Sequence, residues 1–248
     1  MKRIILEICV DDAAGLSAAS HGGADRVELC SALAMGGLTP SAGLLALAAD
    51  GPLPAMAMIR PRAGDFVWTA DDCRAMRIDI AAVRAAGLAG VVIGASLPDG
   101  RLDAAVLQDL VAAADGLDIT LHRAIDLVPD VAQAMALCAQ LGIIRILSSG
   151  GARTALQGLH RLAAMATAGP GITVMPGGGI TAQNAALFAA RFPLREIHAS
   201  ASGLLPPPND PRLAEFGFQP VGARATDVAK VRALRHALDQ ITASPPSG

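Results

Sequence analysis

One pattern runs through this chain from end to end: a short apolar segment, a turn and a helical segment, repeated eight times. The helical segments often end at a glycine, which is typical of a helix C-terminus. Strands that alternate with helices form parallel sheets, and eight such units predict a (β/α)8 barrel in a single domain. An open doubly wound sheet is the nearest alternative, but it rarely repeats the unit eight times. The expected strands are 4–10, 26–30, 54–60, 90–95, 119–126, 143–147, 172–175 and 195–198.

The expected helices start at residues that suit a helix N-terminus. Thr39 can cap the second helix with Pro40 at its first position, and 69–72 resembles a capping box. Thr181 is expected to cap another helix. The expected helices cover 13–20, the segment from 40, 69–86, 103–114, 129–142, the segments from 154 and from 181, and 226–241.

The last part of the chain is less regular. The segment 201–224 is polar and proline-rich, and its portion 204–211 is expected either to fold over the barrel mouth or to be partly disordered. We expect the barrel to occupy 1–242 and a disordered tail to occupy 243–248.

The composition of the 248 residues argues against several functional classes. A net charge of −2 leaves no basic field for nucleic acid. Aromatic residues are only 2% of the chain, so stacking platforms for bases or sugars are scarce. No apolar run free of charges and glycines reaches the roughly 20 residues that span a bilayer, and charges come too early for a signal sequence. We therefore expect a cytoplasmic protein that binds neither nucleic acid nor membranes.

Polar side chains collect where the expected strands end, and in a barrel those ends converge on one face. Alternation places Glu7 and Cys9 on one side of the first strand, and Glu28 and Cys30 on one side of the second. A carboxylate that points into a barrel needs a partner, because an unpaired buried charge is costly. Either these groups form a structural charge network or they act as acids and bases. The candidate catalytic residues are Glu7, Glu28, Arg60, His122, Arg123 and Asp126, with Arg60 and Arg123 as the expected partners of the glutamates.

Glycine-rich loops follow the sixth and seventh expected strands. Glycine lets several backbone N–H groups approach one anion, and barrels often bind a phosphate near their last strands. The candidate anion-binding residues are Ser149, Gly150, Gly177, Gly178 and His198.

The four cysteines contain no CxxC pair, which excludes a zinc ribbon or finger, and we expect them to be reduced. Thiolates favour soft ions such as Cu(I), and Cys9 and Cys30 lie near each other if their strands pair. The alternative is that both behave as small buried apolar residues. Cys73 and Cys138 fall in expected helices and fit that second interpretation.

Several segments share their order and spacing with one known family. They are 7–9 (EIC), 22–30 (GGADRVELC), 36–41 (GGLTPS), 58–62 (MIRPR), 64–66 (GDF), 90–94 (GVVIG), 120–126 (TLHRAID), 175–179 (MPGGG) and 196–198 (EIH). Over roughly 4–200 the chain thereby resembles the CutC family. Ile125 replaces an aromatic residue of the family pattern, a change expected to affect packing more than chemistry.

The resemblance implies a cytoplasmic TIM barrel, a homodimer and a role in copper homeostasis, with Cys9 and Cys30 at the matching positions for a copper site. One hypothesis is therefore a copper-handling protein in which these cysteines bind Cu(I) and His122 or His198 assists. Within this hypothesis the partner is a copper ion.

The other hypothesis is an enzyme of lyase or isomerase type that acts at the barrel mouth on a small anionic molecule, with or without a phosphate group. Glu7 or Glu28 would be its base, His122 its acid or electrophile, and the arginines its anion partners. No nucleotide fingerprint occurs, so we expect no nucleotide cofactor. The only lysines, Lys2 and Lys230, lie away from the expected strand ends, which argues against a Schiff-base mechanism.

Overall fold

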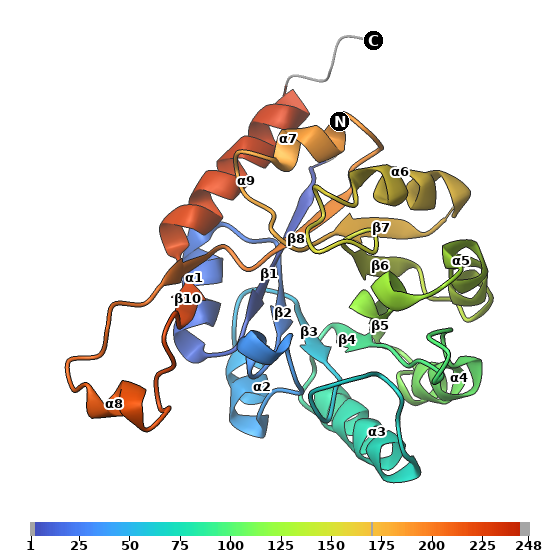
Figure 1. The fold of residues 1–248 in the computed structure, drawn as a ribbon, viewed down its shortest axis with the longest axis horizontal. Helices are drawn as coiled ribbons and strands as arrows, with labels where there is room; N and C mark the ends of the chain where they lie inside the picture. The colour runs from blue at the N-terminus through green and yellow to red at the C-terminus, as the bar shows by residue number, and fades with distance from the viewer. Residues whose placement is uncertain (1–2, 170, 244–248) are drawn as a thin grey trace.

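Parallel pairing joins the strands in the order of the sequence. In the computed structural model, which describes residues 3–169 and 171–243, eight parallel strands form one sheet whose order is β7-β6-β5-β4-β3-β2-β1-β8 (Figure 1). Strand β8 also lies against β7, so the sheet curls into a nearly closed barrel. The (β/α)8 prediction is confirmed, since a doubly wound sheet would reverse its strand order. The strands are β1 Ile5–Val10, β2 Arg26–Leu29, β3 Ala55–Met58, β4 Gly90–Ile93, β5 Asp118–Leu121, β6 Arg145–Ser148, β7 Thr173–Pro176 and β8 Glu196–Ala199.

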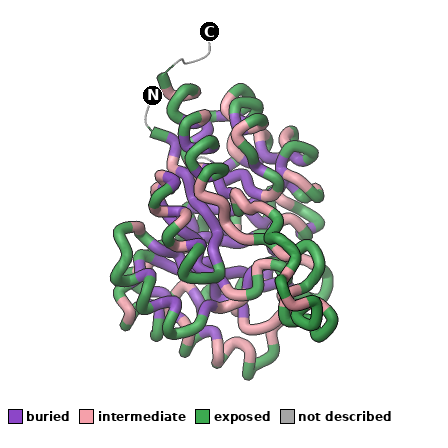
Figure 2. Tube along the Cα trace, turned by 90° about the vertical axis from the view of Figure 1, so that its left-hand side faces the viewer, coloured by how far each residue is buried: buried purple, intermediate pink, exposed green. Residues whose placement is uncertain are grey.

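Helices surround this barrel, and the buried backbone runs through its middle while exposed segments lie on the outside (Figure 2). Among the described residues, no helix is both long enough and apolar enough to cross a bilayer. The helices are α1 Ala13–Gly22, α2 Ala42–Ala49, α3 Ala70–Ala85, α4 Ala104–Ala113, α5 Val131–Gln140, α6 Leu159–Ala168, α7 Ala185–Ala189, α8 Arg212–Glu215 and α9 Val228–Ala243, with 3-10 turns η1 Leu33–Met35 and η2 Arg123–Leu127.

Alternation sends successive side chains of a strand to opposite faces of the sheet, and on β1 it separates an apolar outer face from a polar inner one. On β1, Leu6 and Ile8 are fully buried in the main apolar core. Glu7, between them, bonds instead to side chains from β2 and β8 inside the barrel. The expected faces of the first strand are therefore confirmed.

The capping box of α3 is confirmed, because Thr69 Oγ1 accepts from the Asp72 amide while Asp72 accepts from that of Thr69. The expected cap of α2 is wrong: Ser41 caps this helix, and Thr39 Oγ1 accepts from the Arg60 amide at 3.0 Å. Thr39 is thus committed to the end of β3 and is not available to α2.

Two later helices are shorter than expected. Helix α6 begins at Leu159 and not near 154, because the preceding residues form turns. Helix α7 begins at Ala185, after a turn in which the Asn184 side chain accepts from the Thr181 amide at 2.9 Å. Thr181 therefore does not cap α7.

The expected strand 119–126 is wrong in its second half. Strand β5 ends at Leu121, and η2 follows directly. His122 ends the strand because its Nδ1 accepts from the Ala124 amide at 3.1 Å and so caps the 3-10 turn. Arg123 and Asp126 consequently belong to the turn and not to a strand face.

The segment 204–211 does not cover the barrel mouth. Short strands β9 Ser202–Leu204 and β10 Arg224–Thr226 pair antiparallel, and the chain between them carries α8 out to the side of the barrel, beyond α1 (Figure 1). The loop thereby leaves Phe216 and Phe218 exposed. In the tail expected to be disordered, Ala243 is the last residue of α9, and 244–248 lie outside the described residues.

Candidate functional site

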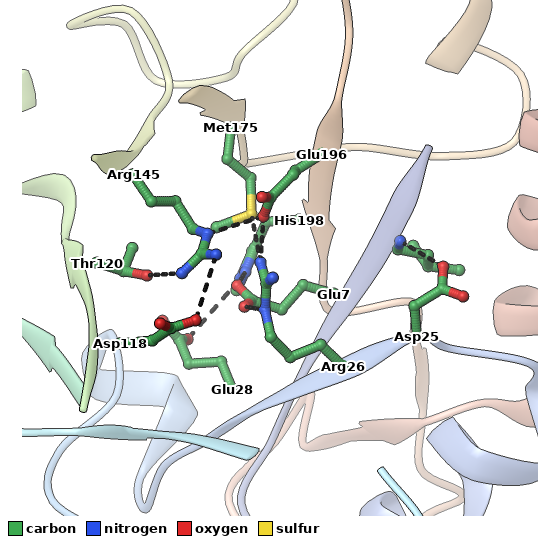
Figure 3. A network of polar contacts seen from close by, with 11 residues as sticks. Glu7, Asp25, Arg26, Glu28, Asp118, Thr120, Arg145, Met175, Glu196 and His198 are labelled. Carbon is green, nitrogen blue, oxygen red and sulfur yellow. Dashed lines mark hydrogen bonds and ion pairs between the residues drawn. The ribbon is translucent and has the colours of Figure 1, made fainter. Parts of the chain in front are cut away.

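A layer of charged side chains fills the barrel near the amino-terminal ends of the strands (Figure 3). Arg26 donates to Glu7 at 2.5 Å and also to Glu196. Arg145 donates to the same Glu196 oxygen at 2.9 Å and to Thr120 at 3.3 Å. The buried carboxylates are therefore matched by two arginines, as low-dielectric surroundings require.

The expected pairing of the glutamates with Arg60 and Arg123 is wrong. Both arginines lie beyond the carboxyl ends of their strands, whereas Glu7 is in the middle of β1. The sequence analysis missed Arg26, although alternation already places it on the same face of β2 as Glu28. Glu7 thus belongs to a charge network, one of the two roles left open for it.

His198 continues this layer toward the carboxyl ends of the strands. It pairs across β8 and β1 with Glu7, and its Nδ1 donates to Glu7 Oε1 at 2.8 Å. Burial raises the pKa of Glu7, but the hydrogen bonds and charges of His198 and Arg26 outweigh it and lower that pKa to about 2. For His198, burial disfavours the charged ring and by itself lowers the pKa. The Glu28 carboxyl, Cys9 and the Glu7 carboxylate outweigh burial and raise that pKa well above its ordinary value.

His198 also belongs to a cluster of three potential metal ligands. One donor atom each from Cys9, Glu28 and His198 lies within 4.8 Å of the others, and all three residues are buried. Register explains the meeting, because β1 and β2 pair with Cys9 opposite Glu28. Cys30 is offset by two residues and lies beside the cluster, with its thiol donating to Glu28 Oε2 at 3.5 Å.

Glu28 and Cys30 both hold their protons more tightly than usual. Burial raises the pKa of Glu28, and the Glu7 carboxylate adds to the effect. Burial also raises the pKa of Cys30 well above its ordinary value, reinforced by Glu28. Glu28 Oε1 finds no hydrogen-bond partner in the described part of the chain. This carboxyl oxygen is thus both buried and unpaired.

His122 lies on another side of the interior as a neutral imidazole. Burial, with the positive charge of Arg60, lowers its pKa to about 3. Because the Ala124 amide donates to Nδ1, the proton of the neutral ring is on Nε2. The ring packs on Phe66 at 4.7 Å between centroids. It also fills the space left by Gly94, where a Cβ would lie 2.7 Å from Nε2 and closer still to Cε1 and Nδ1.

The lowered pKa of His122 predicts a loss of stability on acidification. An unfolded histidine takes up a proton near pH 6.5 whereas folded His122 does so only near 3, so stability is lost as pH falls from 6.5. Compared with His122→Asn, whose amide oxygen can still accept from Ala124, the natural chain should lose about 1 kcal/mol per pH unit between pH 6 and 4. Urea denaturation of both proteins at several pH values measures the difference. Parallel pH profiles would contradict it.

The loop after β6 is occupied by the protein's own carboxylate. Asp126 accepts from the amides of Ser149 and Gly151 at 3.0 Å and from the hydroxyls of Ser148 and Ser149. Arg123 donates to the same carboxylate at 2.8 Å. Asp126 therefore fills the position that the sequence analysis assigned to a bound anion at Ser149 and its neighbours.

A cavity of about 200 Å³ opens at the carboxyl ends of the strands and brings together most of the candidate residues. Other candidates lie beside or below it: Glu7 in the charged layer, Cys30 next to Glu28, and Asp126 with Ser149 and Gly150 in the β6 loop. Gly177 follows β7, and its amide donates to the Ser148 carbonyl at 2.9 Å. Phe66, which the sequence analysis did not select, also lines the cavity. The candidates that line it are Cys9, Glu28, Arg60, His122, Arg123, Gly178 and His198.

The chain is similar to known proteins over most of its length. The model of the CutC family matches residues 4–203. A family protein CutC from Sinorhizobium medicae is 55% identical over 244 residues, covering 98% of this chain and 99% of the relative. One from Caulobacter vibrioides is 52% identical, covering 92% and 94%.

Solved structures agree. The structure of a copper homeostasis protein CutC from Streptococcus agalactiae superimposes with a TM-score of 0.76 at 28% identity, over 79% of this chain and 98% of the other. A KDPGal structure superimposes with a TM-score of 0.59 at 12% identity, a likeness of fold alone. On the family model and the curated relatives, this chain belongs to the CutC family.

Proposed function

We propose that this protein binds a copper ion inside its barrel through Cys9, Glu28 and His198, and that it takes part in copper homeostasis. The observation that carries the proposal is the convergence of a thiol, a carboxyl and an imidazole from three adjacent strands within 4.8 Å. The name of the structurally similar protein from Streptococcus agalactiae links that protein to copper homeostasis.

The surroundings of His198 suit a metal ligand. A ligating histidine commonly donates its other ring N–H to a carboxylate, which fixes the ring and increases its basicity. Here Nδ1 is bound to Glu7, while Nε2 is 3.8 Å from Glu28 Oε2 on the side of the cluster. A metal ion at this position would replace the proton that His198 holds.

The sulfur ligand favours copper in its reduced state. Thiolate is a soft ligand that selects Cu(I), and imidazole also suits copper. Cys30, beside Glu28, would supply a second sulfur on losing its proton, which retains the Cys9 and Cys30 pair expected from the sequence. The described cysteines are free thiols, and we propose the reducing cytoplasm as the place where they remain so.

Replacing Cys9 tests this site. Cys9→Ser removes the soft ligand at the centre of the cluster, so we expect Cu(I) affinity to fall about 100-fold. The measurement is competition against a chromophoric Cu(I) chelator with the reduced full chain. Cys138→Ser is the matched control, because Cys138 is a buried thiol of α5 outside the cluster. Equal affinities of the two variants, or no Cu(I) binding by the natural chain, would overturn the proposal.

A further inference from the structure

Arg60 is a buried cation that lacks an anionic partner. It is 6% exposed and donates to three backbone carbonyls, those of Met35 at 2.8 Å, Gly37 at 3.1 Å and Gly64 at 2.9 Å. Within the described residues no carboxylate pairs with it, and its Nε has no acceptor. Buried charges in proteins are normally paired, as Arg26 and Arg145 are in the layer below.

His122 leaves a second donor unused on the same cavity. It is 3% exposed, and its Nε2–H finds no acceptor in the part of the chain that the structure describes. Leaving a buried N–H without a partner is unfavourable, because the group has lost its hydrogen bonds to water. The Phe66 ring contacts both groups, with Arg60 at 5.1 Å from its centroid, and holds them at one side of the cavity.

The rim of the cavity adds the donors of Arg123, and among the described residues that line the cavity Glu28 is the only one with a carboxyl group. Arg123 donates from Nε to Asp126 and from Nη2 to Ser149. Its Nη1 lies next to Gly178, 3.6 Å from the position that a Cβ on this glycine would take. In the loop after β6, the Ser149 and Gly151 amides already donate to the Asp126 carboxylate. Arg60 and His122 line the cavity, whereas Asp126 and Ser149 of this loop do not.

We propose that this cavity binds a small organic oxyanion, a carboxylate or a phosphate, through Arg60 and His122. Glu28, whose carboxyl also lines the cavity, gives such a ligand a second polar partner, which favours an anion that also carries a hydroxyl or carbonyl group. This subsite shares the cavity and Glu28 with the cluster proposed for copper, but its two donors, Arg60 and His122, are not among the proposed copper ligands. A bound anion would supply the negative charge that Arg60 lacks among the described residues.

Calorimetric titration of the copper-free full chain distinguishes the possible anions. The probes are inorganic phosphate, lactate and propionate, the last being lactate without its hydroxyl. We expect one-to-one binding of phosphate or of lactate, with lactate tighter than propionate if the ligand is a hydroxy acid. Because copper is absent, the outcome does not depend on the copper proposal. No binding of any probe by the natural chain would overturn the subsite.

Two variants locate the bound probe. Arg60→Gln should weaken binding at least tenfold, because a charge-assisted hydrogen bond is lost. Arg60 also holds three loop carbonyls, so His122→Phe, which keeps an aromatic ring but no donor, provides a second measurement with the same expected loss. Arg77→Gln, at an exposed ion pair with Asp109 outside the cavity, is the control. Natural affinity in folded Arg60→Gln or in His122→Phe would overturn the assignment.

Discussion

Replacing Arg26 with methionine is expected to lower the free energy of unfolding by about 3–5 kcal/mol. The methionine fills much of the same volume but leaves Glu7 and Glu196 facing each other inside the barrel without the cation that joins them. Removing one partner of a buried ion pair costs more than the pair contributes, because the remaining charges stay in a low dielectric. Urea denaturation measures the loss.

An exposed ion pair provides the matched control for Arg26. Arg77 bonds to Asp109 at 2.6 Å, but both side chains are nearly half exposed. Arg77→Met should therefore cost no more than about 1 kcal/mol. If the two methionine variants lost similar stability, the buried network would contribute no more than a surface pair.

Replacing Gly94 with alanine is expected to cost about 3 kcal/mol, although the change adds one methyl group. The new Cβ would overlap three atoms of the His122 ring. That ring cannot move aside, because it is packed on Phe66 and held by the Ala124 amide. Forcing extra atoms into a packed interior costs about 1–3 kcal/mol, and this contact lies at the upper end.

A double variant tests that explanation. In Gly94→Ala/His122→Ala the imidazole is absent, so the added methyl has room, and we expect the double variant to be more stable than the sum of the two single losses predicts. Denaturation of all four proteins gives the coupling energy. Additive losses would show that Gly94 is required for a reason other than the ring.

The sequence predicted the barrel correctly because each of its signals is local. Period-two alternation, helix caps such as Thr69 and glycines at helix ends all act within a few residues, and the eight units repeat them. The same alternation placed Glu7 on the inner face of its strand. Errors arose where a side chain makes a distant bond, as when Thr39 joins β3 in place of capping α2.

The candidate site was foreseen as a set of residues but not as an arrangement. Glu28, His122 and His198 were all selected, and all line one cavity. Their contacts differ from those expected. The Asp126 carboxylate occupies the loop after β6, and Cys9 clusters with Glu28 and His198, with Cys30 beside this cluster. The acid and base roles of these residues stay predictions.

Sequence by itself determined which side chains point into the barrel, because the direction of a side chain follows from the geometry of its own strand. Only the tertiary structure decided which of them touch. Strand register sets Cys9 opposite Glu28 and Glu7 opposite His198, and register depends on the closure of the whole sheet. No single segment carries that information. The tertiary structure was therefore needed to show that Glu7 pairs with Arg26 and that Arg60 bonds to backbone carbonyls.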